Sequence, residues 1–274
     1  MKWTEDADNA VKKVPFFVRK KVRARVETQV TDAGKHVVTL ADVKSAQQRY
    51  LENMRAEIKG YQIDTCFGPS GCPNRAMHME RLLEKIDQLL AAADLLSFLK
   101  HHVSGDLKYH HEFRISLAEC PNACSQPQIK DVGVIGAIVP HLTEEACTLC
   151  GACEDICPDN AVRLSQSLEQ PEINFQRCMS CGKCIKACPS GTIQEGKRGF
   201  RVQVGGKLGR HPQLAREMPG IYTQEKVLEI VQYCISFYKQ NNRHAKRFAQ
   251  IFTTSDFNEL VSRFGETESE LPKY

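Results

Sequence analysis

Cysteine is the residue type whose number and spacing in this chain could do chemistry. The 274-residue sequence contains 13 cysteines, and all except Cys234 stand in short spaced groups. Two segments, CTLCGACEDICP (147–158) and CMSCGKCIKACP (178–189), repeat the pattern C-x2-C-x2-C-x3-C-P. Thiolates at this spacing hold the irons of 4Fe–4S clusters, and the fourth cysteine of each run binds the neighbouring cluster.

The repeat therefore predicts two iron–sulfur clusters with crossed ligands. The first set is Cys147, Cys150, Cys153 and Cys188, and the second set is Cys178, Cys181, Cys184 and Cys157. Zinc sites or disulfides are the alternative. A structural zinc site needs only four ligands, however, so it does not explain why the same cysteine spacing occurs twice. Such a module moves electrons, and nothing in the two runs binds a substrate.

Four further cysteines lie outside the repeat. TCFGPSGCP places Cys66 and Cys72 around a Gly/Pro turn, and ECPNAC places Cys120 and Cys124 directly after a predicted strand. The first loop alone does not say what its thiols bind. Cys234 stands by itself in the apolar run VLEIVQYCISFY, where we expect a small core residue.

Composition limits the class of protein. The 37 basic and 33 acidic residues are nearly balanced, which does not point to a nucleic-acid partner. No apolar run reaches the roughly 18 residues that cross a bilayer, and the first residues lack the apolar region of a signal peptide. We therefore expect a cytoplasmic protein without membrane insertion, in which a reducing environment favours metal-bound cysteines over disulfides.

The periodicity of apolar residues indicates which elements position these groups. Helices are predicted from about Glu5 to Thr28 with an interruption near Pro15, from Thr39 to about Ile58 with Asp42 near its start, and over 74–100. Strands are predicted at 113–120, 131–139 and 199–206. Two final helices are expected at 223–240, capped by Thr223, and at 255–264.

The pairing of C-x5-C with C-P-N-x-C between two strands resembles the sirohaem and 4Fe–4S region of sulfite and nitrite reductases. The likeness extends to dissimilatory and anaerobic sulfite reductases, which carry a two-cluster ferredoxin domain inserted after the second strand. The resemblance implies that Cys66, Cys72, Cys120 and Cys124 hold a third cubane. It also implies that Cys124 bridges this cubane to the sirohaem iron. A bare cubane without sirohaem is the alternative.

The same resemblance names further residues. The segment GGKLGRHP (205–212) is similar to the part of the family that follows the insert. Because sirohaem carries many carboxylates, its pocket must be basic and rich in hydrogen-bond donors. The implied catalytic candidates are Lys207, Arg210 and His211, and the implied cofactor-binding candidates are Cys124, Arg75, Asn122, Lys207 and Arg210. Each basic residue could instead be a solvated surface charge.

The first sixty residues depart from that family. The stretch WTEDADNAVKKVPFFVRKKVRARVE resembles the small C-terminal domain of light-independent protochlorophyllide reductase, a helical domain associated with a tetrapyrrole. Family members usually contain two related halves, and this chain has no room for the first. RKKVRAR (19–25) could cover one face of a tetrapyrrole, or it could be a solvated helix face. The missing half could come from another subunit or a second copy.

These observations predict an α+β fold in which a small antiparallel sheet with flanking helices forms a sirohaem-binding half-domain. The expected domains are a helical domain at 1–60, the sirohaem and 4Fe–4S domain at 61–140 and 196–274, and the ferredoxin insert at 141–195. The predicted function is sulfite or nitrite reduction by an oxidoreductase with three 4Fe–4S clusters and sirohaem. An external ferredoxin or flavoprotein would donate electrons through the insert, and a homodimer or hetero-complex is expected. The alternatives are an electron-transfer subunit without sirohaem and a reductase or maturation protein that acts on a tetrapyrrole.

Overall fold

The computed structural model describes residues 1–243 and 246–265. It divides into two compact units, of which the first contains Met1–Ile58 with Asp106–Lys108. The second contains Lys59–Gly105 and the chain from Tyr109 onward. None of the described helices is long and apolar enough to cross a bilayer.

The first unit is helical, as predicted. Helices α1 (Glu5–Lys12) and α2 (Phe16–Asp32) are separated at Pro15, and α3 (Leu40–Glu57) follows. Two short parallel strands, β1 (Lys2–Trp3) and β2 (Val37–Val38), pair beside them. The start of α3 is fixed by Asp42, whose carboxylate accepts hydrogen bonds from the Thr39 backbone N–H at 2.9 Å and from its hydroxyl at 2.6 Å.

The second unit is built on a five-stranded sheet. Its order is β3 (Tyr61–Thr65), β4 (Phe113–Ala118), β5 (Val132–Leu142), β8 (Ile193–Val204) and β9 (Arg216–Glu217). The expected antiparallel sheet is wrong, because β3, β4 and β5 run parallel and only β5–β8 and β8–β9 are antiparallel. Strand β3 was not predicted from the sequence, and its parallel pairing with β4 needs the long crossover that lies between the two strands.

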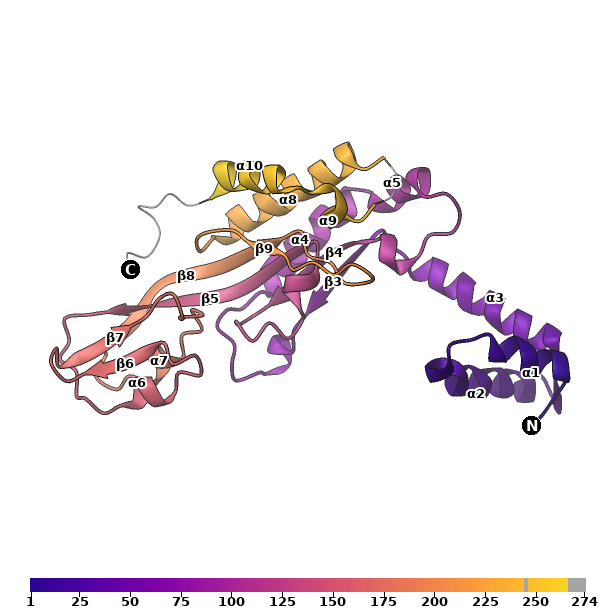
Figure 1. Ribbon diagram of the computed structural model, residues 1–274, viewed down its shortest axis with the longest axis horizontal. Coiled ribbons are helices and arrows are strands. Elements are labelled where there is room, and N and C mark those ends of the chain that lie inside the picture. The colour runs from indigo at the N-terminus through magenta and orange to yellow at the C-terminus, as the bar shows by residue number, and fades with distance from the viewer. Residues whose placement is uncertain (244–245, 266–274) are drawn as a thin grey trace. The chain divides into compact units, whose positions relative to one another are not determined.

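Helices flank this sheet (Figure 1). The helix expected over 74–100 is two helices, α4 (Glu80–Ala92) and α5 (Leu95–His102), because Asp94 takes a left-handed conformation with φ 47°. Thr223 caps α8 (Gln224–Asn241) as predicted, and its side chain accepts a hydrogen bond from Lys226 N–H. The short helix α9 (Phe248–Ile251) and helix α10 (Thr254–Phe264) follow, and α8 packs against α4, β5 and β8.

Strands β5 and β8 form a long ribbon that leads from the sheet to the cysteine-rich insert (Figure 1). Their pairing extends from Val132↔Val204 to Leu142↔Ile193, with a register shift between Ile138 and Pro140. The insert contains α6 (Ala152–Asp155), the antiparallel pair β6 (Val162–Ser165) and β7 (Gln170–Ile173), and α7 (Lys183–Ala187). Both ends of the insert therefore leave the sheet side by side.

Candidate iron–sulfur sites

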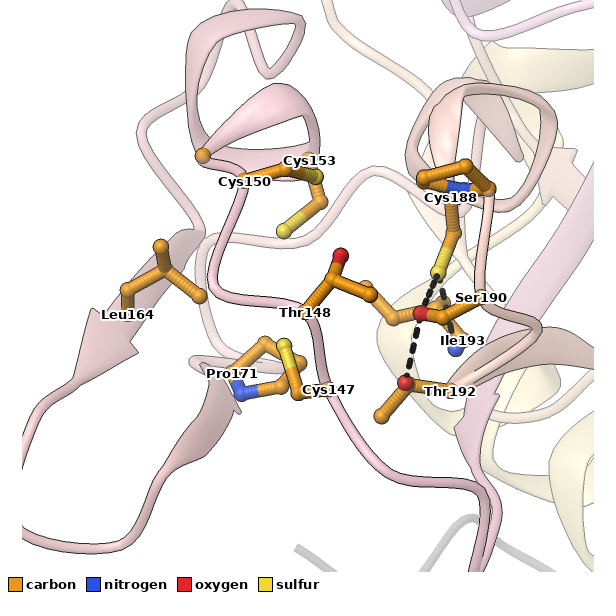
Figure 2. Close-up of a pocket in the computed structure, with 12 residues that line it drawn as sticks. Cys147, Thr148, Cys150, Cys153, Leu164, Pro171, Cys188, Ser190, Thr192 and Ile193 are labelled. Carbon is orange, nitrogen blue, oxygen red and sulfur yellow. Dashed lines mark hydrogen bonds between the residues drawn. The ribbon is translucent and has the colours of Figure 1, made fainter.

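The first cysteine set surrounds one hollow in the insert. Cys147, Cys150, Cys153 and Cys188 all line this space, and Figure 2 shows their side chains around it. Cys153 belongs to α6, whereas Cys188 directly follows α7. Residues from both repeats thus meet at one place, as the crossed-ligand prediction requires.

The second set surrounds another hollow in the insert. It is lined by Cys157 from the first repeat and by Cys178, Cys181 and Cys184 from the second. Cys184 is buried, whereas Cys157, Cys178 and Cys181 are half-buried. The two hollows are related by the internal repeat, since each takes three cysteines from one run and one from the other.

The backbone repeats along with the cysteines. In each run, the residue before the second cysteine and the glycine after it take left-handed conformations. These residues are Leu149 (φ 54°) with Gly151 (φ 79°) and Ser180 (φ 57°) with Gly182 (φ 70°). This geometry turns backbone N–H groups toward sulfur, and Leu149 N–H and Ser180 N–H lie 3.4 Å from Cys147 Sγ and Cys178 Sγ. Such donors stabilise thiolates bound to a cluster.

The third set gathers at the carboxyl ends of β3 and β4. Cys66 directly follows β3, and its sulfur accepts hydrogen bonds from Gly68 N–H at 3.4 Å and Glu119 N–H at 3.3 Å. Cys120 is buried, whereas Cys124 is exposed on the following loop. That loop holds the left-handed residues Ala123 (φ 52°) and Gln126 (φ 58°), and strained residues of this kind cluster at functional sites.

Burial makes the most enclosed of these thiols poor acids without a bound cation. The pKa of Cys184 is raised to about 12, mainly by burial and in part by nearby Cys178 and Cys181. Burial also raises the pKa of Cys120, and the adjacent Cys66, Cys124 and Cys72 add to that rise. The positive charge of cluster iron would reverse this effect, since metal binding needs the thiolate.

The donor sets agree with the 4Fe–4S prediction in residue type. In a cubane each cysteine binds a different iron, so the four sulfurs stand around a space rather than at a single point. The first and second quartets each line one such space.

Arg75 and Glu119 form an ion pair behind the third set. Arg75 Nε lies 2.5 Å from the Glu119 carboxylate, and Arg75 Nη2 also lies 2.5 Å from Glu80. The Glu119 side chain is 3% exposed, and its carboxylate leaves no space for a side chain at Gly68. Sequence reasoning missed Glu119, although an acidic residue between the apolar strand FRISLA and Cys120 is a signal for such a role.

The other predicted residues lie farther along the surface. Arg210 and His211 are exposed and Lys207 is half-buried on a loop closed by paired hydrogen bonds between Lys207 and Gln213, both 2.9 Å. The segment around this loop contacts Gln128 and Lys130 through backbone hydrogen bonds. Asn122 is exposed, two residues before Cys124. The structure thus gathers the twelve predicted cysteines and leaves these four polar residues around the Cys124 loop and on the segment after the insert.

Two family profiles match the chain. The one described as nitrite and sulphite reductase 4Fe-4S domain matches residues 62–272, and the one described as proto-chlorophyllide reductase 57 kD subunit matches residues 3–47. Both resemblances seen in the sequence are therefore confirmed. The crystal structure of dissimilatory sulfite reductase I aligns with a TM-score of 0.47 at 16% identity, over 77% of this chain and 54% of that one.

Curated relatives match separate stretches. Coenzyme F420-dependent sulfite reductase of Methanocaldococcus jannaschii is 44% identical over 100 residues, 36% of this chain and 16% of that protein. One of the subunits of anaerobic sulfite reductase from Salmonella typhimurium is 25% identical over 158 residues, 58% of this chain and 37% of that protein. One of the subunits of light-independent protochlorophyllide reductase from Chlorobium limicola is 56% identical over 43 residues, 16% of this chain and 8% of that protein. This chain spans less than half the length of each of these relatives.

Proposed function

Because this chain belongs to the family of nitrite and sulphite reductases with a 4Fe-4S domain, we propose that it is the catalytic half of a sirohaem-dependent oxidoreductase that reduces sulfite or nitrite. Two relatives that match it are named as sulfite reductases, which favours sulfite. The observation that carries the proposal is the third quartet, in which Cys124 is exposed while Cys120 is buried. An exposed thiolate can bind a large cofactor on its outer side and a cluster on its inner side.

The residues of this chain would hold three cubanes and one face of sirohaem. When bound, these groups supply the electrons for the multi-electron reduction of the oxyanion. The insert cysteines would hold the clusters that receive electrons, and Cys124 would lie next to the sirohaem that uses them. A ferredoxin or flavoprotein is the proposed external donor.

Some of the basic residues near the third set are already in ion pairs, which limits the number that can bind the carboxylates of sirohaem. Arg75 is paired with Glu119 and Glu80, and Lys130 is paired with Asp64. Asn122, Lys207, Arg210 and His211 remain as candidates for binding its carboxylates and the substrate anion. Since these residues are few, we propose that the rest of the pocket comes from another subunit or a second copy of this chain.

Anaerobic purification tests the proposal, with an absorption spectrum and counts of iron and acid-labile sulfide on the same sample. Three cubanes give about twelve irons per chain, and sirohaem adds one iron with its own absorption bands. Stoichiometric sirohaem bands would support a catalytic role, and sulfite and nitrite would then be tested as substrates. Absence of sirohaem from every preparation that retains the clusters would overturn the catalytic proposal.

The N-terminal unit supports a second candidate, in which the chain acts on a tetrapyrrole rather than through one. Phe16 and Phe17 are 82% and 75% exposed at the start of α2, and they precede the cationic run RKKVRAR. Exposed aromatic and cationic side chains together suit a flat anionic macrocycle. About twelve irons without sirohaem bands, together with binding of a free carboxylated porphyrin that is lost in a Phe16→Ala/Phe17→Ala variant, would favour this candidate.

A further inference from the structure

Glu119 joins the two loops that carry the third cysteine set. It stands between β4 and Cys120, and its backbone N–H donates a 3.3 Å hydrogen bond to Cys66 Sγ. Its backbone carbonyl accepts hydrogen bonds from the N–H groups of Ala76 and Met77, at 2.9 and 3.0 Å. One residue therefore ties the loop after β3 to the loop after β4.

The carboxylate of Glu119 lies against the loop of Cys66. Its Oε2 occupies the space that a Cβ at Gly68 would need, and the Gly68 N–H donates to Cys66 Sγ at 3.4 Å. Its Oε1 accepts hydrogen bonds from the Met79 N–H at 3.3 Å and from Arg75 Nη2 at 2.8 Å. These contacts hold one negative charge at a fixed place beside the backbone that surrounds the Cys66 sulfur.

Glu119 differs from the acidic residues beside the first set. Glu154 and Asp155 follow Cys153 in α6, but both are exposed, and Cys150 of the same set is exposed as well. Water and salt screen charges of that kind, whereas the Glu119 side chain is only 3% exposed. Its charge therefore acts on the third set with little screening.

Two other carboxylates are buried in the described part of the chain, those of Glu112 and Asp131. Glu112 precedes β4 and Asp131 precedes β5, so both lie at the ends of these strands that are remote from the third set. The six residues of β4 separate Glu112 from Glu119 by about 20 Å. Glu112 is therefore a matched control for the loss of a buried carboxylate.

We propose that Glu119 lowers the reduction potential of the cluster held by the third set, and that Arg75 acts in the opposite direction. Reduction adds one electron to a cluster, so a fixed negative charge beside the cluster makes this step less favourable. The positive charge of Arg75 is shared between Glu119 and Glu80, whereas the Glu119 carboxylate lies directly against the cysteine loop. The inference rests on the proposed function, because it requires a cluster at the third site, but it does not require sirohaem.

An EPR-monitored redox titration of the complete, iron-loaded chain tests this inference. The titration is run at about pH 8, where carboxyl groups of ordinary pKa are ionised. The signal of the third cluster is identified as the one that Cys66→Ser abolishes. At a fixed ambient potential, we expect Glu119→Gln to raise the ratio of reduced to oxidised third cluster about tenfold, which corresponds to about 59 mV for one electron. Arg75→Gln should lower this ratio, and Arg75→Gln/Glu119→Gln should give a potential between those of the two single variants.

The opposite signs separate an effect of charge from a loss of structure. A looser third site would shift the potential in the same direction in both single variants, because each variant breaks the same ion pair. Glu112→Gln removes a buried carboxylate at the other end of β4 and should leave the potential of the third cluster unchanged. Shifts of the same sign in Glu119→Gln and Arg75→Gln, no shift in either, or an equal shift in Glu112→Gln would overturn the inference.

Arg75→Gln decides the case in which Glu119→Gln does not fold or does not load the third cluster. A lower potential of the third cluster in Arg75→Gln would then support the inference, and an unchanged or higher potential would overturn it. A wild-type chain that never carries a cluster at the third site would instead refute the proposed function. Iron counts and the EPR signal that depends on Cys66 distinguish these two failures.

Discussion

At the residue scale, Cys124 differs from its three partners in exposure, and this difference makes a prediction. Under the proposed function, Cys124→Ser should abolish the magnetic and spectral coupling between sirohaem and the third cubane, because the thiolate that both would share is lost. Cys234→Ser is the control, since Cys234 is fully buried in α8 away from every quartet. EPR and absorption spectra of both variants measure the effect. Coupling that survives in Cys124→Ser would mean that another group bridges the two cofactors.

The ion pair behind the third set predicts a large effect on stability. Glu119→Gln leaves Arg75 without its buried partner, and breaking such a pair costs about 3–5 kcal/mol of unfolding free energy. Glu80→Gln removes the other partner of Arg75, but Glu80 is 50% exposed, and exposed pairs contribute only about 0–1 kcal/mol. Anaerobic denaturant unfolding compares the two variants. Equal losses would show that Glu119 is no more important than a surface charge.

At the element scale, the start of α3 predicts a dependence on pH. Hydrogen bonds from Lys35 and Thr39 lower the pKa of Asp42 from 3.8 to about 2. Because the folded pKa is below the unfolded one, this stabilisation is complete above 3.8 and is lost as the pH falls toward about 2. Asp42→Asn removes this dependence and about 0.3–1 kcal/mol at neutral pH.

Hydrogen exchange of the α3 amides in the complete chain measures this effect. Protection in the wild type should fall between pH 3.8 and about 2, whereas Asp42→Asn should show a smaller fall over the same range. Asp32→Asn is the control, since Asp32 is exposed at the end of α2. If Asp42→Asn kept the wild-type pH profile, Asp42 would not be the group that stabilises α3.

The internal repeat offers a matched pair of glycines for the next prediction. Gly151 and Gly182 both have positive φ, which costs a residue with a Cβ about 1–2 kcal/mol. Only Gly182 also abuts Ile138, whereas the nearest atom to a Cβ at Gly151 is 4.0 Å away. Gly182→Ala should therefore lower the Tm of the iron-loaded chain more than Gly151→Ala does. Equal decreases in Tm would mean that the Ile138 side chain moves aside for the added methyl group without a cost in stability.

The sequence predicted most helices and every cysteine group, because periodicity and ligand spacing are local properties. It missed β3, since YQIDT has neither clear alternation nor an apolar run, and it missed the break at Asp94, where a non-glycine residue takes a left-handed conformation. The contacts of Ile138 could not be predicted from the sequence either. They join β5 to α7, close to the register shift that follows Ile138. Packing between residues so far apart in the chain leaves no signal in a single segment.

At the scale of the whole molecule, the paired ends of the insert predict that it can be removed. Leu142 and Ile193 lie directly opposite each other, so Asn-Gly in place of residues 143–192 should close β5 and β8 as a tight hairpin. We expect about four irons per chain, all at the third site, in place of about twelve. Iron analysis and circular dichroism test this. A shortened chain that folds but holds no iron would show that the third site needs the insert.

The exposure of Cys150 also has a consequence for the oxygen sensitivity of the chain. Two cysteines of the three quartets are exposed, Cys150 in the first set and Cys124 in the third, and under the proposed function sirohaem would cover Cys124. A cluster at Cys150 would then be the first that dissolved oxygen reaches, so damage in air would begin in the insert. A chain damaged in this way would lose its supply of electrons before its catalytic site, and rebuilding a single cluster would restore its activity.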